Sequence, residues 1–370
     1  MTTARVGVLR LYLAAARYSS DWGPEGYPTG PELDTPFADW QEAVAWLDAG
    51  ASELADVVTY AATNGRPEYA CWIAEGLVDY FTRQGRYREC RTILTGVLPL
   101  ADTVSDRRMA SSLRSCLGTA YGMQNHYQPR AWLTDVLEQS RAWYTEALEV
   151  SRRDGDAREQ ARALGGLGTV ARSLGQDGEA AACLTQVLEL ARPLDDDWLI
   201  GMAMSNLGVI RYGRGQHAEA LDCLAEALER AEKIGSPRAI GKTLCFAGGL
   251  YLDLGQHAEA AKALRRAVGF AEEIGELPLY VFSLTRLGAA EKGLGNVSAA
   301  IELYHRALVA ITEQTSPEME IEIRNRLGAS YLAGGKPAQA REQFELVLDL
   351  LGETGNPEER SRALEGLAHC

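Results

Sequence analysis

Apolar residues recur along the chain at helical spacing, and the whole pattern repeats with a 40-residue period. A Leu-Gly pair occupies positions 167–168, 207–208, 287–288 and 327–328, and Ala247-Gly248 fills the remaining copy. Seven residues after each pair stands a Gly, and five residues later an Ala: Gly175, Gly215, Gly255, Gly295 and Gly335, then Ala180, Ala220, Ala260, Ala300 and Ala340. Self-similarity at a fixed period of this length indicates an array of stacked structural repeats.

Each repeat is predicted to be a pair of antiparallel helices, which we call helix A and helix B. In helix A the small residue of the pair lets a neighbouring helix approach closely, and the following Gly ends the helix because it tolerates a positive φ. Helix B is predicted, for example, over residues 218–233, where apolar residues form one stripe at i, i+3, i+4 and i+7. A further Gly closes three of the B helices: Gly235, Gly275 and Gly355.

The register extends beyond these five copies. Leu77 and Leu117 are again one full period apart, but the step from Leu117 to Leu167 exceeds the period by ten. We therefore expect one ten-residue insertion, near residues 122–139, in a connection between helices A and B. Because Leu367-Ala368 begins an eighth helix A, the sequence predicts about seven and a half repeats over residues 67–370.

Residues 1–66 precede the register and form a separate predicted segment. An apolar helical pattern over residues 6–17 is followed by a loop rich in Gly and Pro at residues 23–36. Two further helices are predicted at residues 37–49 and 51–63, and Asn64-Gly65 closes the second.

The repeat resembles the tetratricopeptide repeat. As in that family, a small residue follows a Leu, an aromatic residue stands three places further on, and an Ala opens helix B; the aromatic residues are Phe81, Tyr121, Tyr251 and Tyr331. The resemblance covers about residues 71–368 and implies an all-α fold, a right-handed superhelical solenoid of antiparallel helix pairs. The period here is longer than the usual period of about 34 residues, so we expect longer B helices or longer connections.

The N-terminal segment is similar to the junction between the nucleotide-binding (NB-ARC) portion and the repeats of AfsR-type regulators, of the actinobacterial antibiotic regulatory protein (SARP) family. The similarity lies in Leu9-Arg-Leu-Tyr-Leu-Ala-Ala-Ala-Arg17, the Pro-containing loop, Phe37-Ala-Asp39, Ala45-Trp-Leu47 and Ala61-Ala-Thr-Asn-Gly65. It implies the effector-sensing part of a bacterial transcriptional regulator of antibiotic or secondary-metabolite production. The implied partners are a protein or peptide segment, from the upstream domains of the same regulator or from the transcription machinery, or a small-molecule effector. A free-standing adaptor or a peptide-pheromone receptor is the alternative.

The charge of the chain argues against two kinds of partner. Lys and Arg number 37 and Asp and Glu number 51, which gives a net charge of −14 and disfavours direct binding to nucleic acid or to anionic membranes. No run approaches the roughly 18 apolar residues of a membrane span. The seven Cys include no C-x-x-C pattern, which fits reduced thiols and a cytoplasmic location.

No catalytic, cofactor or metal site is recognisable in the sequence, so we expect a protein that is not an enzyme. There is no G-x-x-x-x-G-K-[ST] phosphate loop. His217 and His257 stand one period apart, as do Cys183 and Cys223; a metal site or a redox pair is conceivable, but solvated helix-start residues and small buried hydrophobes are the simpler interpretation. Close helix packing explains the run Gly165-Gly-Leu-Gly168 better than a phosphate loop does, because the run lies inside a helix A.

The predicted binding surface is the concave face of the A helices, opposite the Leu-Gly positions. A groove that mixes apolar residues with scattered cations suits an amphipathic peptide, a partner helix or an acidic small molecule, and the alternative is that these are solvated residues of helix A. The candidates are Arg162, Thr169, Arg172, Met202, Ser205, Asn206, Tyr212, Lys242, Leu252, Phe282, Lys292 and Asn325. Trp72, Glu75, Asp79, Arg83, Ser112, Ser115, Thr119, Val209, Cys245, Thr285, Glu322 and Leu332 are predicted on the same face.

Two further surfaces are candidates for contacts. The insertion carries Tyr127 and Trp132, and it is either an interaction loop or a structural lid over helices A and B. At the other end of the chain, Leu364 and Leu367 make the terminal helical face a candidate homodimer interface.

Overall fold

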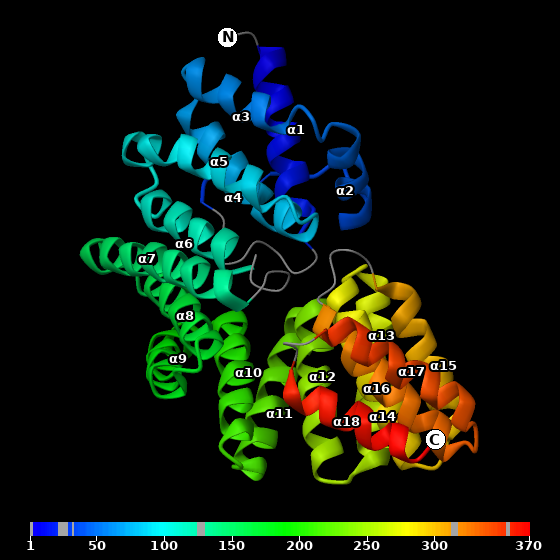
Figure 1. Cartoon of the computed structure of the whole chain (residues 1–370). Coiled ribbons are helices and arrows are strands. Elements are labelled where there is room, and N and C mark those ends of the chain that lie inside the picture. Colours follow the sequence, from blue (N-terminus) through cyan, green and yellow to red (C-terminus); the bar gives the residue numbers. More distant parts are fainter. Residues whose placement is uncertain (1–2, 21–28, 32, 124–129, 312–316, 353–355) are drawn as a thin grey trace. The chain divides into compact units, whose positions relative to one another are not determined.

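The computed structural model of the chain describes residues 3–20, 29–31, 33–123, 130–311, 317–352 and 356–370. Within these ranges the fold is all-α, a stack of 18 α-helices that pair antiparallel along the sequence (Figure 1). No strand occurs in the described ranges. The predicted fold class is therefore confirmed.

Five copies of the repeat have the predicted helix pair. The A helices each contain 17 residues and recur at the same point of every period: α8 (Ala157–Ser173), α10 (Asp197–Gly213), α12 (Pro237–Asp253), α14 (Leu277–Gly293) and α16 (Pro317–Ala333). The B helices are α9 (Asp177–Ala191), α11 (His217–Ile234), α13 (His257–Glu273), α15 (Val297–Ala310) and α17 (Pro337–Leu351). A short 3₁₀ helix, η3 (Arg192–Leu194), extends α9. Because only residues 174–176 separate α8 from α9, long helices account for most of the period.

The turn between the two helices requires a Gly. Gly255 has φ 69°, its N–H donates to the Leu252 carbonyl at 3.0 Å, and the next N–H, of Gln256, donates to Tyr251 at 2.8 Å. A residue with a Cβ atom is strained at this φ, so the recurring Gly ends helix A as predicted. Gly235 and Gly275 close their B helices in the same way, whereas α17 ends before Gly352 and the predicted terminator Gly355 lies outside the described residues.

The same architecture continues on both sides of the five copies. Towards the N-terminus lie α4 (Pro67–Arg83), α5 (Tyr87–Val97), the 3₁₀ helix η1 (Leu98–Thr103), α6 (Met109–Gly122) and α7 (Arg130–Asp154). At the C-terminal end, α18 (Pro357–Ala368) begins one full period after α16. The register read from the sequence therefore holds through eight A helices of the described chain.

The insertion differs from its expected form. We expected residues near 122–139 to form a connection, but α7 is 25 residues long and already begins at Arg130. Its end is in register with the other B helices, since Gly155 occupies the same turn as Gly235 and has φ 73°. The extra residues therefore extend a B helix at its N-terminus, and residues 124–129, including Tyr127, lie outside the described part.

The N-terminal segment contains the three predicted helices: α1 (Thr3–Tyr18), α2 (Trp40–Ala49) and α3 (Leu54–Thr63). Helix α2 begins three residues later than expected because Asp39, in an extended conformation, caps it by accepting a hydrogen bond from the Glu42 N–H at 2.8 Å. One cluster of buried apolar residues runs from Leu9 in α1 to Ala120 in α6.

The chain divides into two compact units. Unit 1 comprises residues 1–214 and 229–236, and unit 2 comprises residues 215–228 and 237–370, so helix α11 is shared between the two units. The sequence suggested a different boundary, at residue 66, between the N-terminal segment and the repeats. That boundary stays a prediction.

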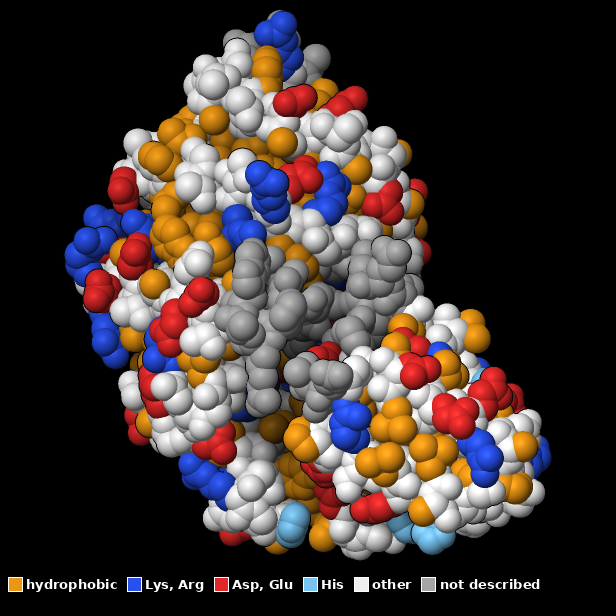
Figure 2. All heavy atoms as spheres, in the orientation of Figure 1, with side chains coloured by type: hydrophobic (Ala, Val, Ile, Leu, Met, Phe, Trp, Pro, Cys, Tyr) orange, Lys and Arg blue, Asp and Glu red, His pale blue; other side chains and the backbone are white. Residues whose placement is uncertain are grey.

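The surface carries both signs of charge. On the face that Figure 2 displays, Lys and Arg side chains alternate with Asp and Glu side chains over the described residues of the chain. Among the described helices, none combines the length and the apolar character that crossing a membrane requires.

Candidate functional site

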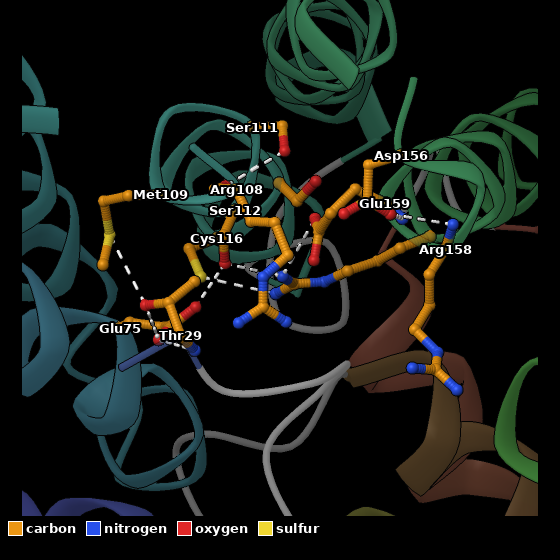
Figure 3. Close-up of polar contacts among 12 residues, drawn as sticks. Thr29, Glu75, Arg108, Met109, Ser111, Ser112, Cys116, Asp156, Arg158 and Glu159 are labelled. Atoms are coloured by element: carbon orange, nitrogen blue, oxygen red, sulfur yellow. Dashed lines mark hydrogen bonds and ion pairs between the residues drawn. The ribbon is translucent and has the colours of Figure 1, made fainter. Parts of the chain in front are cut away.

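In unit 1, buried polar side chains from three successive A helices, α4, α6 and α8, meet one another. We call this group the Glu75 cluster; it consists of Thr29, Glu75, Ser112, Cys116, Glu159 and Arg162. Each of these residues is at most 8% exposed. Figure 3 shows Thr29, Glu75, Ser112 and Cys116 pointing toward one another from different segments of the chain.

Glu75 is the centre of the hydrogen bonds in the cluster. Its Oε2 accepts from the Thr29 N–H at 3.1 Å and from the Thr29 hydroxyl at 2.8 Å, and its Oε1 accepts from the Ser112 hydroxyl. The Arg162 guanidinium donates to Ser112 Oγ at 2.9 Å and to Cys116 Sγ at 3.4 Å. The network therefore joins α4, α6 and α8 across their facing sides.

Glu159 lies on the other side of Arg162 and is less well partnered. Its Oε2 is 3.6 Å from Arg162 Nη1 and accepts no hydrogen bond from the described residues. Burial raises the pKa of Glu159 to about 7, while the Arg162 charge opposes the rise and the nearby charges of Glu75 and Asp156 add to it. Asp156 fixes the backbone here, since its side chain caps α8 by accepting from the N–H groups of Arg158 and Glu159.

A short segment that precedes α2 crosses this face of the A helices. We call residues 29–31 the strap. The Arg17 guanidinium donates to the carbonyl oxygens of Thr29 and Pro31, and the Gly30 N–H donates to Asp106 Oδ2 at 3.4 Å. Gly30 lies against the indole of Trp72 so closely that a Cβ atom there would be 2.3 Å from the ring, and its φ is +86°. Side chains of the surrounding helices and loop thus form hydrogen bonds with the backbone of a short segment that bends at Gly30.

In unit 2, a pocket of 680 Å³ lies between the A helices α14, α16 and α18. Its polar wall includes Lys292, Glu322, Asn325, Arg326, Arg362, Glu365 and His369. Its apolar wall includes Ala289, Tyr304, Ala329, Leu332 and Phe344, together with Gly293 and Gly366. We call this the Lys292 pocket.

Of the predicted groove residues in unit 1, several are engaged within the protein. Arg162 is 8% exposed and belongs to the Glu75 cluster, so it does not line an open groove as we expected. Arg172 donates to Asn206 Oδ1 at 3.1 Å, and burial lowers the pKa of the Arg172 guanidinium. Met202 fills the space left by Gly165, where a Cβ atom would be 2.3 Å from the Met202 methyl carbon. Thr169, Ser205 and Tyr212 are half-buried on their A helices.

The predicted residues of unit 2 are divided between internal contacts and the pocket. Lys242 lies 3.8 Å from Glu276, and Arg286 stacks on the Phe282 ring with its guanidinium carbon 4.2 Å from the ring centroid. Leu252 is half-buried. Lys292 and Asn325, which belong to successive A helices, line the same pocket, although Asn325 is only 5% exposed.

The sequence did not identify two groups of contributing residues. Arg326 and Arg362 line the Lys292 pocket. The sequence pattern assigned the groove and core positions next to Arg326 to Asn325 and Leu327, and in the last helix it pointed to Leu364 and Leu367 but not to Arg362. Thr29 comes from the Gly- and Pro-rich segment and carries no repeat register that could have linked it to Glu75. Contacts of these kinds follow from the stacking of helices, which no local pattern encodes.

The remaining candidates have structural settings. Gly166 and Gly168 lie inside α8, and a Cβ atom at either would come within 3.0 Å of Tyr144 or Leu184, so close packing explains the Gly run as predicted. All seven Cys are free; Cys183 is half-buried in α9 and Cys223 is buried in α11. Among the described residues no three His, Cys, Asp or Glu side chains are grouped to hold a metal ion. Trp132 lies in α7, but its side chain is outside the described part, and Leu364 is 52% exposed.

Two stretches of the chain match the sequence profile of the tetratricopeptide repeat, residues 132–192 and residues 199–273. No curated protein sequence matches the chain. Solved structures give a likeness of fold.

Three of these structures are similar over most of this chain. The first is a signal transduction ATPase with numerous domains that carries a tetratricopeptide repeat sensor, from Pyrococcus horikoshii, with 16% identity and a TM-score of 0.63 over 89% of this chain and 48% of that one. A Rap protein complexed with competence and sporulation factor has 13% identity and a TM-score of 0.56 over 88% of this chain and 81% of that one. In the hetero-tetramer Cut9–Hcn1 of APC/C, the matched chain has 13% identity and a TM-score of 0.54, and the match covers 89% of this chain and 59% of that one.

The profile match falls on helices α7 to α13, and the helix pairs of the structure extend the same unit to both sides. Residues 132–192 and 199–273 are therefore tetratricopeptide repeats within an all-α stack of antiparallel helix pairs.

Proposed function

We propose that this chain is a non-catalytic binding domain whose A-helix faces take up a short segment of a partner protein. One observation carries the proposal: the strap lies across α4 and α6 as a bound peptide would. Its Thr29 N–H and hydroxyl, its Gly30 N–H and its Thr29 and Pro31 carbonyl oxygens all meet side chains of other elements. Polar side chains of neighbouring elements thus satisfy the backbone groups of a buried segment, as the binding of a peptide segment requires.

The chemistry of this face defines the kind of segment that it accepts. Glu75 and Asp106 accept N–H and hydroxyl groups, and Arg17 donates to carbonyl groups. The position next to Trp72 has room only for Gly. A partner segment should therefore present a Thr or Ser followed by a Gly with a positive φ, and it would compete with the strap for the same groups.

The experiment uses the full chain and a labelled synthetic peptide with the sequence of residues 26–34. In the Gly30→Ala chain the added methyl group meets Trp72, so the strap should leave the face and the peptide should bind, as measured by fluorescence anisotropy. A peptide with Ala in place of Gly30 is the matched control and should not bind. Adding Arg17→Met to the Gly30→Ala chain should remove peptide binding, because two carbonyl contacts are lost.

The result can contradict the proposal in two ways. If the Gly30→Ala chain binds the peptide and its Ala variant equally well, the face does not distinguish the strap sequence from other sequences. Absence of binding to a Gly30→Ala chain that keeps the helical circular-dichroism signal of the wild type would mean that the strap is a fixed part of the fold.

The regulatory context is a finer part of the proposal. We propose the sensing part of a bacterial transcriptional regulator of the AfsR type, on the similarity of residues 9–65 to the junction in that family. The fold likeness to repeats called a sensor supports this context. Co-expression with the domains encoded upstream should give a complex, and replacing Arg172 by Glu tests the A-helix face of unit 1. If the wild-type chain does not bind these domains, the AfsR-type context is contradicted. The proposal that the chain binds a segment of a partner protein would not be affected.

A free-standing adaptor or peptide receptor is the second candidate function. Here the favouring observation is that the match covers 81% of a Rap protein whose structure contains competence and sporulation factor. A coding sequence without upstream domains, together with binding of the peptide above, would favour this candidate.

A further inference from the structure

The Lys292 pocket of unit 2 combines an apolar floor with a cationic wall. Tyr304 packs against Gly288, where a Cβ atom would be 2.7 Å from its ring, and Phe344 packs against Gly328 and Gly366 in the same manner. Tyr304 and Phe344 are 1% and 2% exposed, so both rings are fixed between helices and form a rigid base. The pocket's 680 Å³ is within the range of about 300–1,000 Å³ found for sites of small organic ligands.

The cations of the wall differ in how they are neutralised. Arg326 pairs with Glu322 at 2.8 Å, and Arg362 pairs with Glu358 and Glu359, each at 2.6 Å. Lys292 has no carboxylate partner among the described residues, although it lies in the same pocket. Burial and the neighbouring Arg326 charge both lower the pKa of Lys292, because each disfavours the ammonium form.

The Oδ1 atom of Asn325 is a second polar group in the pocket that lacks a partner among the described residues. The amide nitrogen of the same side chain donates to the Glu359 carbonyl at 3.0 Å and to Glu359 Oε2 at 2.7 Å, which fixes the orientation of the amide. The Oδ1 atom accepts no hydrogen bond from the described residues although the side chain is buried. A buried acceptor without a donor is costly, so a ligand that brings an N–H or O–H group would be favoured there.

We propose that the Lys292 pocket binds a small amphipathic carboxylate, with its carboxylate on the Lys292 ammonium, its apolar body against Tyr304, Phe344 and Leu332, and an N–H or O–H donor toward Asn325. Of the Lys and Arg side chains that line the pocket, Lys292 is the one without a carboxylate partner among the described residues. The carboxylate of the ligand would be that partner. The site lies in unit 2 and the strap in unit 1, so the two proposals fail or hold independently.

Indole-3-propionate is a suitable probe because it has a carboxylate, a planar apolar body and one N–H donor. Indole-3-propionamide is its uncharged match. A second pair, N-acetyl-Gly-Trp with a free or an amidated carboxyl group, separates a free small acid from the carboxyl terminus of a peptide as the source of the anion. Calorimetric titration of the full chain should show saturable binding of a carboxylate probe and weaker binding of its amide.

Substitution of Lys292 tests the role assigned to it. Lys292→Met should weaken binding of the carboxylate by about tenfold or more, the effect expected when one charged hydrogen bond is lost, and Lys292→Arg should retain most of it. Lys242→Met is the matched control, because Lys242 is also on an A helix of unit 2 but lies near Glu276. In chains with dimethylated lysines, the ¹³C resonance of Lys292 should titrate at a higher pH when the probe is bound.

The outcomes are distinct. Binding of indole-3-propionate but not of N-acetyl-Gly-Trp identifies a site for small acids. Binding of both carboxylates supports a carboxylate site that is also open to peptide termini. Equal affinity for a carboxylate and its amide, an unchanged affinity in Lys292→Met, or no saturable binding of any probe would overturn the proposal.

Discussion

At the scale of single residues, Glu159 is the most unusual group in unit 1. It is 2% exposed and faces Arg162 without a hydrogen bond to Oε2, so its charged form is poorly solvated. With a pKa raised to about 7 from an ordinary value of 4.5, the carboxyl group is partly protonated at neutral pH. Folding therefore favours the protonated form of this side chain.

The pH dependence of stability follows from this shift. The unfolded chain releases the Glu159 proton near pH 4.5 and the folded chain near pH 7, so the stabilisation is complete below pH 4.5 and is lost as the pH rises to about 7. The loss is on the order of 3 kcal/mol. The free energy of unfolding, measured by urea denaturation at several pH values, should fall with rising pH more steeply in the wild type than in Glu159→Gln. Comparing the two proteins cancels the contribution of the other titrating groups. Parallel stability curves for the two proteins would contradict the raised pKa.

At the scale of elements, the close contact of α6, α7 and α8 depends on Tyr144. Its ring lies against Gly118 of α6 and Gly166 of α8, where Cβ atoms would be 2.8 Å and 2.3 Å away. The Tyr144 hydroxyl is 3.0 Å from Thr119 Oγ1. Two glycines thus make room for one aromatic ring, and the extended helix α7 is held between its neighbours through this residue.

Removal of the ring should destabilise this part of the stack. We expect Tyr144→Ala to cost about 2–4 kcal/mol, because the ring is partly buried and leaves a cavity between three helices. Tyr144→Phe should cost only about 1 kcal/mol, since it removes a hydrogen bond alone. Thr145→Ala, at an exposed position of the same helix, is the control. Denaturant midpoints followed by circular dichroism would show this order, and equal midpoints for Tyr144→Ala and Thr145→Ala would contradict it.

At the scale of the whole molecule, the two compact units suggest two cooperative regions. In a stack of repeats each unit contacts mainly its neighbours, so stability is distributed locally along the chain. The chain changes unit after residues 214, 228 and 236, so residues 215–236, which include α11, are the expected boundary between the two regions.

Hydrogen exchange measured by mass spectrometry can test this division. Phe344→Ala removes a fully buried ring of unit 2 and should increase exchange in α14–α18 while leaving α4–α8 protected. Leu113→Ala, at a buried position of α6, is the matched substitution in unit 1 and should give the reverse pattern. A uniform loss of protection across both units after either change would mean that the chain unfolds as one region.

The amino-acid sequence determined the helix pairs and their register. Gly175, Gly215 and Gly255 end A helices because a positive φ is a local requirement of one residue, and local requirements can be read from a sequence. The apolar stripes and the Leu-Gly pairs likewise predicted which helix faces are buried. The lengthened α7 was not predicted, because the insertion breaks the period that defined every other element.

The tertiary structure alone decided which polar groups meet. Arg162 was expected in an open groove, but Ser112 and Cys116 of the preceding A helix lie against it and bury it. Glu75 meets Thr29 of the N-terminal segment, and Lys292 of α14 shares a pocket with Arg362 of α18, two A helices further along the chain. Such contacts depend on how far one helix pair is turned and shifted against the next. That geometry arises from the packing of side chains such as Tyr144 and Phe344 into glycine-sized gaps, which a repeat period does not specify.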